Sequence, residues 1–365
     1  MDMLFETKQS ILVVDDNPTN LRFLQEILKS DYKVYASPSG ERALAFLEHT
    51  IPNLILLDVE MPGLNGYEVI SRLKNNYMWE NIPVIFLTAQ EGRDKEHLAL
   101  SMGAVDYILK PIATSVVKSR VGLHIELESY KQNLEHMVTL KTMQLEKTQD
   151  SILEMLSNVT AYRDNETGAH TKRTTHFVNL LVHELMAHKD PRYQISQEYA
   201  LNMIKSAKLH DIGKVGVPDG ILLKPAKLTD EEFELIKKHT LLGAQILDDA
   251  IADLGETSSF LNVAREIAFT HHEKWNGSGY PSGTGGENIP ISGRIMAIAD
   301  VYDALISQRP YKVPKTHEES MKIIHESAGT HFDPNIVSLC EDVFQRFPEI
   351  SQKYKDEDYR VQMLQ

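Results

Sequence analysis

The sequence predicts two domains of different fold class joined by a long helix: an α/β domain with a parallel sheet, then an all-α domain. In the first third of the chain, short apolar segments that end in acidic or hydroxyl residues alternate with amphipathic helical stretches. Residues 126–157 contain neither glycine nor proline and many helix-forming residues. Beyond them helical periodicity dominates and no series of strands is evident. The predicted boundaries are therefore 1–125, 126–157 and 158–365.

The composition excludes several classes of protein. The 365 residues suit two or three domains, and 42% hydrophobic with 25% charged residues is typical of soluble globular domains. The formal net charge of −14 argues against binding of nucleic acid, which needs a basic surface. The sequence has no run of about 18 apolar residues and no secretory signal, so we expect no membrane segment and a cytoplasmic location. The one cysteine, Cys340, excludes an internal disulfide and suits that location.

The first domain is expected to contain at least three buried parallel strands. The apolar segments 10–15, 53–58 and 83–88 are too short for helices and are bounded by polar residues. Amphipathic helical stretches lie between them, at 20–30 and 40–49. Strands that alternate with helices form a doubly wound sheet, which binds its ligands at the carboxyl ends of the strands.

Five polar residues should meet at that edge of the sheet: Asp15, Asp16, Asp58, Thr88 and Lys110. Three crowded carboxylates repel one another unless a cation joins them, and oxygen ligands favour Mg²⁺. A carboxylate beside Mg²⁺ can accept a phosphoryl group, and the Lys110 ammonium could pair with an acid or with that group. Helix capping could explain one of these acids, but it does not explain the set.

This segment resembles a response-regulator receiver domain, which has a flavodoxin-like fold. The resemblance rests on DD at 15–16, DVEMPGLNGYE from Asp58, LTA from Leu87 and GAVDYILKP at 103–111. It implies that Asp58 is the phosphoacceptor and that Asp15, Asp16 and Asp58 bind Mg²⁺. It further implies that Thr88 and Lys110 contact the phosphoryl group, that Tyr107 is the switch aromatic, and that a sensor histidine kinase is a partner.

The connecting helix has an interrupted heptad pattern. The first apolar residues at heptad spacing are Leu127, Tyr130, Leu134 and Met137. The polar residues Lys141 and Gln144 then interrupt the pattern. Apolar residues resume on a shifted phase at Leu145, Ile152 and Leu156. This pattern favours a coiled coil with a stutter near Lys141, which would make the protein a homodimer. The alternative is a single helix that lies along a domain.

The last domain contains a His-Asp pair in the segment 208–222, KLHDIGKVGVPDGIL. The apolar residues before His210 and Asp211 predict a buried helix, and Gly213 and Gly216 indicate where it ends. On that helix Lys214 would follow His210 by one turn. A capping box at 229–232 begins a second helix, which we expect to continue through His239.

Further candidate ligands have helical spacing. Glu166 and His170 are four residues apart and would share a face, the two histidines at 271–272 follow a predicted helix at 262–270, and Asp300 ends an apolar run at 295–299. The complete candidate set exceeds what one ion can use, and it consists of Glu166, His170, His210, Asp211, His239, His271, His272 and Asp300. Imidazole with carboxylate suits Fe or Mn, with Zn as an alternative. Two ions about 3.5–4 Å apart, bridged by a carboxylate and a hydroxide, are a device for splitting phosphate esters.

The stretch 271–290 is predicted to be a loop that forms a wall of the substrate site. Six glycines lie between 277 and 293, and Trp275 and Tyr280 offer flat faces or a phenol donor. Asp303 and Arg309 follow Asp300, and Arg309 and Lys214 could each neutralise a phosphate.

The region resembles an HD-GYP domain, a branch of the HD phosphohydrolases. The matching segments are ETGAH at 166–170, HDIGK at 210–214, the helical His239, HHEKWNGSGYP at 271–281, RIMAIADVYDALISQRPYK at 294–312 and FDP at 332–334. The resemblance implies hydrolysis of cyclic di-GMP to pGpG and GMP with two or three metal ions. The eight candidates would be the ligands, with Asp211 bridging. Asp211 and Lys214 would be catalytic, and Lys214, Tyr280, Asp303 and Arg309 would contact substrate.

Two alternatives stay open. The substrate could be cyclic GMP-AMP or mainly pGpG, because the contacts that would distinguish guanine from adenine are not evident in the sequence. The domain could also be a non-catalytic dinucleotide-binding or adaptor module that recruits a partner such as a cyclase and uses its metals structurally. A DNA-binding output is not supported, because no helix-turn-helix with a basic face is present.

Overall fold

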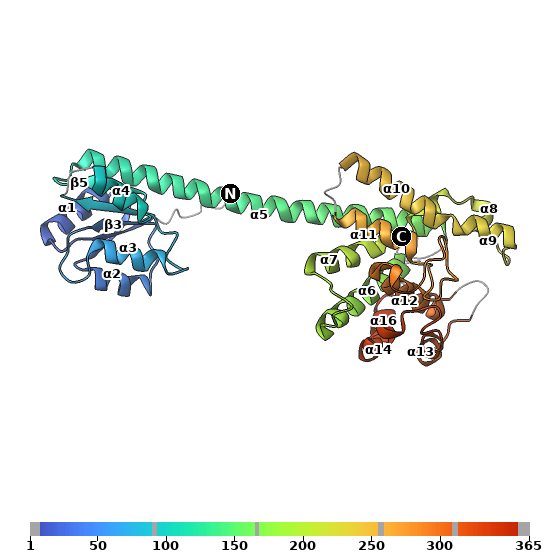
Figure 1. Ribbon diagram of the computed structural model, residues 1–365. Helices are drawn as coiled ribbons and strands as arrows, with labels where there is room; N and C mark the ends of the chain where they lie inside the picture. The colour runs from blue at the N-terminus through green and yellow to red at the C-terminus, as the bar shows by residue number, and fades with distance from the viewer. Residues whose placement is uncertain (1–7, 90–92, 165–167, 255–258, 309–312, 357–365) are drawn as a thin grey trace. The chain divides into compact units, whose positions relative to one another are not determined.

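A computed structural model describes residues 8–89, 93–164, 168–254, 259–308 and 313–356, without the side chains of 93–96. The chain divides into two compact units, Met1–Met143 and Gln144–Gln365, which are described separately (Figure 1). Among the described residues, no helix is both long and apolar enough to cross a membrane.

The first unit is a five-stranded parallel sheet with strand order β2-β1-β3-β4-β5 (Figure 1). The strands are β1 (Ser10–Val14), β2 (Lys33–Ser37), β3 (Leu54–Asp58), β4 (Val84–Thr88) and β5 (Asp106–Leu109). The helices are α1 (Pro18–Leu28), α2 (Gly40–Leu47), α3 (Gly66–Lys74), α4 (Arg93–Ser101) and the start of α5 (Thr114–Arg163). The predicted doubly wound α/β fold and the three predicted strands are confirmed, while β2 and β5 were not predicted.

Alternating side chains of the strands fill two apolar layers. Leu24 and Leu28 of α1 and Val117 and Val121 of α5 cover one face of the sheet. Helices α2, α3 and α4 cover the other face. Because β1, β3, β4 and β5 are neighbours and parallel, their carboxyl ends form one edge, as the predicted receiver site requires.

Helix α5 is 50 residues long and has buried residues near both ends. Val117 and Val121 belong to the core of the first unit, and Leu153 and Ser157 are buried in the second. Every residue from 131 to 149 is exposed, including Leu134 (46%) and Met137 (57%) of the heptad pattern.

The second unit is all-α over its described residues, apart from one isolated bridge between Ala328 and Phe332, so the predicted fold class is confirmed. Its larger helices are α6 (Gly168–His188), α7 (Gln197–Ser206), α10 (His239–Leu254), α11 (Ser259–Thr270), α12 (Ile291–Ile306) and α13 (His317–Glu326). Shorter elements are η1 (Ala207–Leu209), η2 (Ile212–Gly216), α8 (Asp219–Leu222), α9 (Asp230–Lys237), η3 (Gly286–Asn288), α14 (Pro334–Leu339), α15 (Glu341–Phe344) and α16 (Phe347–Lys353). Cys340 is fully buried in the main core, where it acts as a small apolar side chain.

Two helix boundaries differ from the sequence expectation. The helix before His210 ends at Ser206, so His210 and Asp211 lie between two 3₁₀ turns. The helix that begins at the predicted capping box ends at Lys237, and His239 begins a new helix. Asp300, which follows the apolar run 295–299, lies inside α12.

A close backbone contact explains the first of these differences. A Cβ on Gly213 would overlap the carbonyl oxygen of His239 and the backbone of Gly243. The chain after Asp211 therefore packs directly against α10. This contact brings the His-Asp pair close to His239 in space.

Candidate metal centre

Six elements bring together the seven predicted ligands that the structure describes. His170 lies on α6, His210 and Asp211 between η1 and η2, and His239 at the first position of α10. His271 and His272 follow α11, and Asp300 lies on α12. Their ligand atoms form two groups, each within 4.8 Å: Asp211, His239, His271 and His272 in the first, and His170, His210 and Asp300 in the second. Glu166, the eighth candidate, lies outside the described residues.

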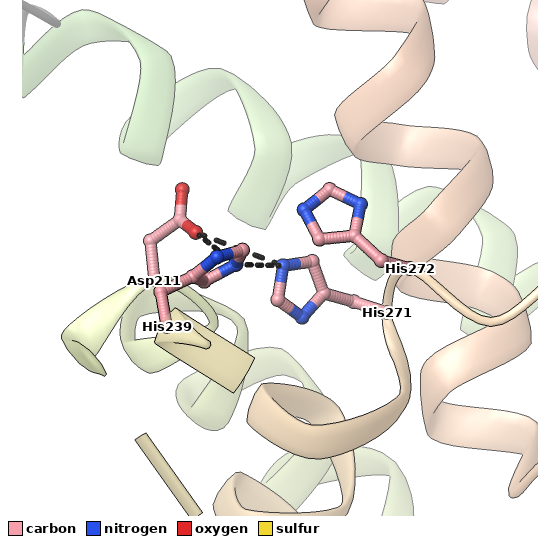
Figure 2. Close-up of side chains that lie close together, drawn as sticks. All are labelled: Asp211, His239, His271 and His272. Carbon is pink, nitrogen blue, oxygen red and sulfur yellow. Dashed lines mark hydrogen bonds and ion pairs between the residues drawn. The ribbon is translucent and has the colours of Figure 1, made fainter. Parts of the chain in front are cut away.

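The first group surrounds one oxygen of Asp211 (Figure 2). Asp211 Oδ1 lies 3.3 Å from His239 Nε2 and 3.6 Å from His271 Nε2, and these two nitrogens are 3.4 Å apart. The ring of His272 stacks obliquely beside that of His271, with centroids 4.1 Å apart. Three imidazoles and a carboxylate thus face one small volume.

The second group is joined to the first through Asp211. His170 Nε2 lies 3.4 Å from His210 Nε2 and 3.7 Å from Asp300 Oδ1. His210 Nε2 lies 3.0 Å from Asp211 Oδ2, the other oxygen of the carboxylate. Asp211 therefore presents one oxygen to each group, which is the arrangement that a bridging ligand requires.

Hydrogen bonds to the far ring nitrogen orient four of the imidazoles. The Nδ1–H groups of His210, His239 and His271 donate to the carbonyl oxygens of Ala207 (2.8 Å), Ile236 (2.7 Å) and Ile267 (2.9 Å). His170 Nδ1 donates to Asp303 Oδ2 at 2.8 Å. A carbonyl can only accept, so each Nε2 keeps a lone pair that points into the centre, as in metal-binding histidines.

The electrostatics also fit a cation. Asp211 Oδ1 is buried and accepts no hydrogen bond. Although burial opposes it, Lys214 and His210 hold the pKa of Asp211 well below its usual range. Burial lowers the pKa of His239 to about 4, and burial with the neighbouring histidines lowers that of His272, so both imidazoles are neutral at pH 7. His210 is also buried, but the charge of Asp211 raises the pKa of His210.

Asp303 was predicted to contact the substrate, but the structure places it in the protein interior. It is 1% exposed, and both of its oxygens are occupied. Arg173 donates to Oδ1 from Nε (2.5 Å) and to Oδ2 from Nη2 (2.9 Å), and Ser307 Oγ donates to Oδ2 at 3.0 Å. Because Asp303 also accepts from His170, it orients one of the candidate ligands and has no oxygen left for a substrate.

The other predicted substrate residues lie beside the centre or outside the described residues. Lys214 Nζ donates to Asp211 Oδ2 at 2.8 Å. The ring of Tyr280 lies 4.8 Å from that of His272, between centroids. Arg309 lies outside the described residues.

The glycine-rich segment is a loop, as predicted, and it contains one 3₁₀ turn. The loop folds back on the candidate metal centre, where Tyr280 lies beside His272. A Cβ on Gly279 would collide with the backbone of 272–274, so only glycine permits this fold. The buried Glu273 accepts the Ser282 amide at 2.7 Å and fastens the far side of the loop. Tyr280 is thereby held at the side of His272.

Three residues that the sequence did not indicate also support this centre. Arg173 orients Asp303, Glu273 holds the loop, and Asp164 binds Lys214. Arg173 follows His170 by about one turn of α6, but the long-range partner of an arginine cannot be predicted from spacing.

The predicted receiver site also assembles. Asp15, Asp16 and Asp58 form a carboxylate group within 4.8 Å. Lys110 donates to Asp58 Oδ2 (2.7 Å) and to Asp15 Oδ2 (3.1 Å). Burial raises the pKa of Asp58 in spite of Lys110, as expected for a buried acid beside other acids. Thr88 ends the neighbouring strand β4.

Tyr107 lies on β5, where it contacts the start of α5. Arg120 of α5 lies over the Tyr107 ring at 6.0 Å and pairs with Asp106. His124, one turn further along α5, lies 3.1 Å from the same carboxylate. The predicted switch aromatic is therefore next to the ion pairs that hold α5 to the sheet.

Comparisons with known proteins identify both domains. The model of the response regulator receiver domain matches residues 11–122, and that of the HD domain matches residues 154–336. A probable cyclic di-GMP phosphodiesterase of Vibrio cholerae is 44% identical over 98% of this chain and 82% of its own length. The cyclic di-GMP phosphodiesterase response regulator RpfG of Xanthomonas campestris is 34% identical over 90% of this chain and 86% of its own. The 3'3'-cGAMP-specific phosphodiesterase 2 of Vibrio cholerae is 40% identical, over 62% of this chain and 40% of its own length.

Proposed function

Because the chain belongs to the response regulators whose output is an HD-GYP-type HD domain with metal-dependent phosphodiesterase activity, we propose that it hydrolyses cyclic di-GMP to pGpG and GMP. The observation that carries this proposal is the convergence of the Nε2 atoms of three histidines, His210, His239 and His271, on the carboxylate of Asp211, one oxygen of which is buried without a hydrogen bond. Three relatives that match at least 90% of this chain carry the cyclic di-GMP name.

The donor set supports at least two divalent ions, one in each group, with Asp211 shared between them. Imidazole nitrogen with carboxylate oxygen favours Fe or Mn, with Zn as an alternative. A third ion would need Glu166 as a further ligand. When bound, such ions would activate a water and neutralise charge on the phosphodiester.

The protein's own residues orient the substrate and the ligands. Lys214 lies beside Asp211, where its ammonium can neutralise a phosphate oxygen next to the metal centre. Tyr280 offers its ring and its phenol at the edge of His272, and burial raises the pKa of that phenol, so it acts as a hydrogen-bond donor. Arg309 would add a second cation for a phosphate.

Regulation would come from the first unit. A receiver domain takes its phosphoryl group from a phosphodonor partner such as a histidine kinase, and we propose Asp58 as the acceptor, with Mg²⁺ on Asp15, Asp16 and Asp58. Lys110 already contacts Asp58 and could follow a phosphoryl group there.

We further propose that α5 pairs with α5 of a second copy. Leu127, Leu134 and Ile152 of the heptad pattern are all exposed, at 59%, 46% and 47%. A row of exposed apolar side chains at heptad spacing is what a coiled-coil partner covers. A homodimer follows from this interpretation.

The experiment is turnover by the metal-loaded full-length protein. Cyclic di-GMP, 3'3'-cGAMP and pGpG are compared in parallel, because the relatives include enzymes named for the first two. We expect His210→Ala and Asp211→Ala to abolish turnover, whereas His183→Ala, an exposed histidine of α6, should not reduce it. Undiminished hydrolysis by both site variants would remove this centre from the proposal. A wild-type protein that holds its metals and binds the dinucleotide without cleaving it would favour the non-catalytic alternative.

A further inference from the structure

The end of α5 is attached to the segment that carries the His-Asp pair. Arg163, the last residue of α5, donates to the carbonyl oxygens of Val215 and Val217 and pairs with Asp219 at 2.6 Å. The next residue, Asp164, forms an ion pair with Lys214. Two consecutive side chains thus tie the helix end to the residues that directly follow Asp211.

Lys214 lies between two carboxylates of different origin. Asp164 contacts its ammonium from the end of α5, and Asp211 Oδ2 contacts it at 2.8 Å from the metal centre. All three side chains are at most 15% exposed. Asp164, Lys214 and Asp211 line one small cavity together with His170 and His210. Asp164 is therefore part of the wall of the centre.

The two carboxylates cannot have the same role once cations are bound. Asp211 would then neutralise metal charge, and its attraction for the Lys214 ammonium would weaken. Asp164 belongs to neither of the two metal groups, so it can keep its contact with Lys214. A lysine ammonium has three N–H donors, so one can stay on Asp164 while another turns to a phosphate oxygen. Without that anchor, the flexible four-carbon side chain of Lys214 would have many alternative positions.

We propose that Asp164 is a positioning residue that holds the Lys214 ammonium beside the metal centre, so that the end of α5 determines where this cation meets the substrate phosphate. This inference rests on the proposed function, because it assigns Lys214 to a phosphodiester. It adds a residue outside the metal ligands, and it gives α5 a direct contact with the residues that carry out the chemistry.

The test uses the full-length, metal-loaded protein and three single variants. Asp164→Asn removes the charge with little change of shape, and Asp164→Glu keeps the charge. Asp150→Asn is the matched control, because Asp150 also lies on α5 and faces a lysine, Lys205, at 3.8 Å. We expect Asp164→Asn to lower kcat for cyclic di-GMP about 10- to 100-fold, as misplaced supporting groups do, with wild-type metal content and thermal stability. Asp164→Glu should recover part of the loss, and Asp150→Asn should match wild type.

A double-variant cycle shows whether Asp164 acts through the lysine. In a Lys214→Met background, Asp164→Asn should cause no further loss of kcat, because the group that it positions is gone. Additive losses in the two backgrounds, or an unchanged kcat in Asp164→Asn, would overturn the inference. Loss of metal ions from Asp164→Asn would also overturn it, because Asp164 would then be a ligand.

Binding of a phosphorothioate analogue of cyclic di-GMP separates this inference from the proposed function. We expect Asp164→Asn and Lys214→Met to weaken its binding by a similar factor, and the double variant to bind no more weakly than either. A wild-type protein without turnover that shows this pattern would contradict the proposed function and leave the positioning role intact. A protein with turnover whose Asp164→Asn variant binds the analogue as wild type does would contradict the positioning role alone.

Discussion

Asp303→Asn is the perturbation that most sharply separates support of a ligand from contact with substrate. The carboxylate accepts from His170 Nδ1, Ser307 Oγ and two nitrogens of Arg173, and it is fully buried. Asparagine keeps the shape but replaces one oxygen by an NH₂ group. Because every neighbour of the two oxygens is a donor, one of these contacts becomes a donor facing a donor.

The expected loss of unfolding free energy follows from the charge of Arg173, which loses its main partner in Asp303→Asn. Removing one partner of a buried ion pair costs about 3–5 kcal/mol of unfolding free energy. Asp356, which lies 3.0 Å from Arg173 Nη1, still balances part of the arginine charge, so we expect about 3 kcal/mol, the lower end of that range. Loss of a carboxylate behind a metal-binding histidine lowers metal affinity or activity about 10- to 100-fold, which is about 1.4–2.7 kcal/mol.

The assay is a Mn²⁺ titration of metal-free protein, followed by kcat and KM for cyclic di-GMP at saturating metal. We expect weaker Mn²⁺ binding and a KM close to that of wild type. Ser307→Ala, which removes a neutral donor to the same carboxylate, should cost about 1 kcal/mol of stability and leave metal affinity unchanged. Unchanged metal affinity with a raised KM in Asp303→Asn would refute this reasoning and restore Asp303 as a substrate contact.

Three further predictions concern the receiver site, the fold and the connecting helix. Asp58→Asn should abolish labelling by a small-molecule phosphodonor, and label on another residue would contradict Asp58 as acceptor. Burial lowers the pKa of His331 to about 4 from an ordinary 6.5, so the unfolded chain binds more protons between these values. The unfolding free energy of metal-free protein should therefore fall as pH drops from 6.5 to 4, less steeply in His331→Gln; equal slopes would count against this. Leu134→Asp should halve the mass measured by light scattering if α5 pairs with a second copy, and a wild-type monomer would exclude that pairing.

The fold class could be predicted because both patterns have a clear period. Apolar runs such as 53–58 are buried on both faces of a parallel sheet, so they can be predicted as strands before the neighbouring strands are known. Strand β2 was missed because only one of its five residues, Ser37, is buried. Strand β5 was missed because it is only four residues long and only one of these residues, Ile108, is buried.

The set of candidate ligands could be predicted, but their local geometry could not. Residue type and motif identify His210, His239 and Asp300 without any backbone detail. The helix boundaries around them depend on contacts that are distant in sequence, such as Gly213 against His239. An expectation of continuous helix therefore fails at 207–211 and at Lys238, where tertiary packing overrides local propensity.

Roles that depend on a partner were the least predictable. Asp303 follows Asp300 by three residues and was predicted to contact substrate. In the structure it is buried and accepts hydrogen bonds from Arg173. Asp164 gave no signal, because an aspartate at a helix end is common and its partner Lys214 is fifty residues away. Such pairings become evident only when the fold brings α5, α6 and α12 together around one centre.

Metal content of anaerobically purified protein, measured with turnover of cyclic di-GMP on the same sample, tests most directly whether two cations share Asp211. We predict at least two ions per chain in active protein, loss of one in His239→Ala and of the other in His170→Ala, and loss of turnover in both. Full turnover by a protein that holds one ion or none would contradict the account.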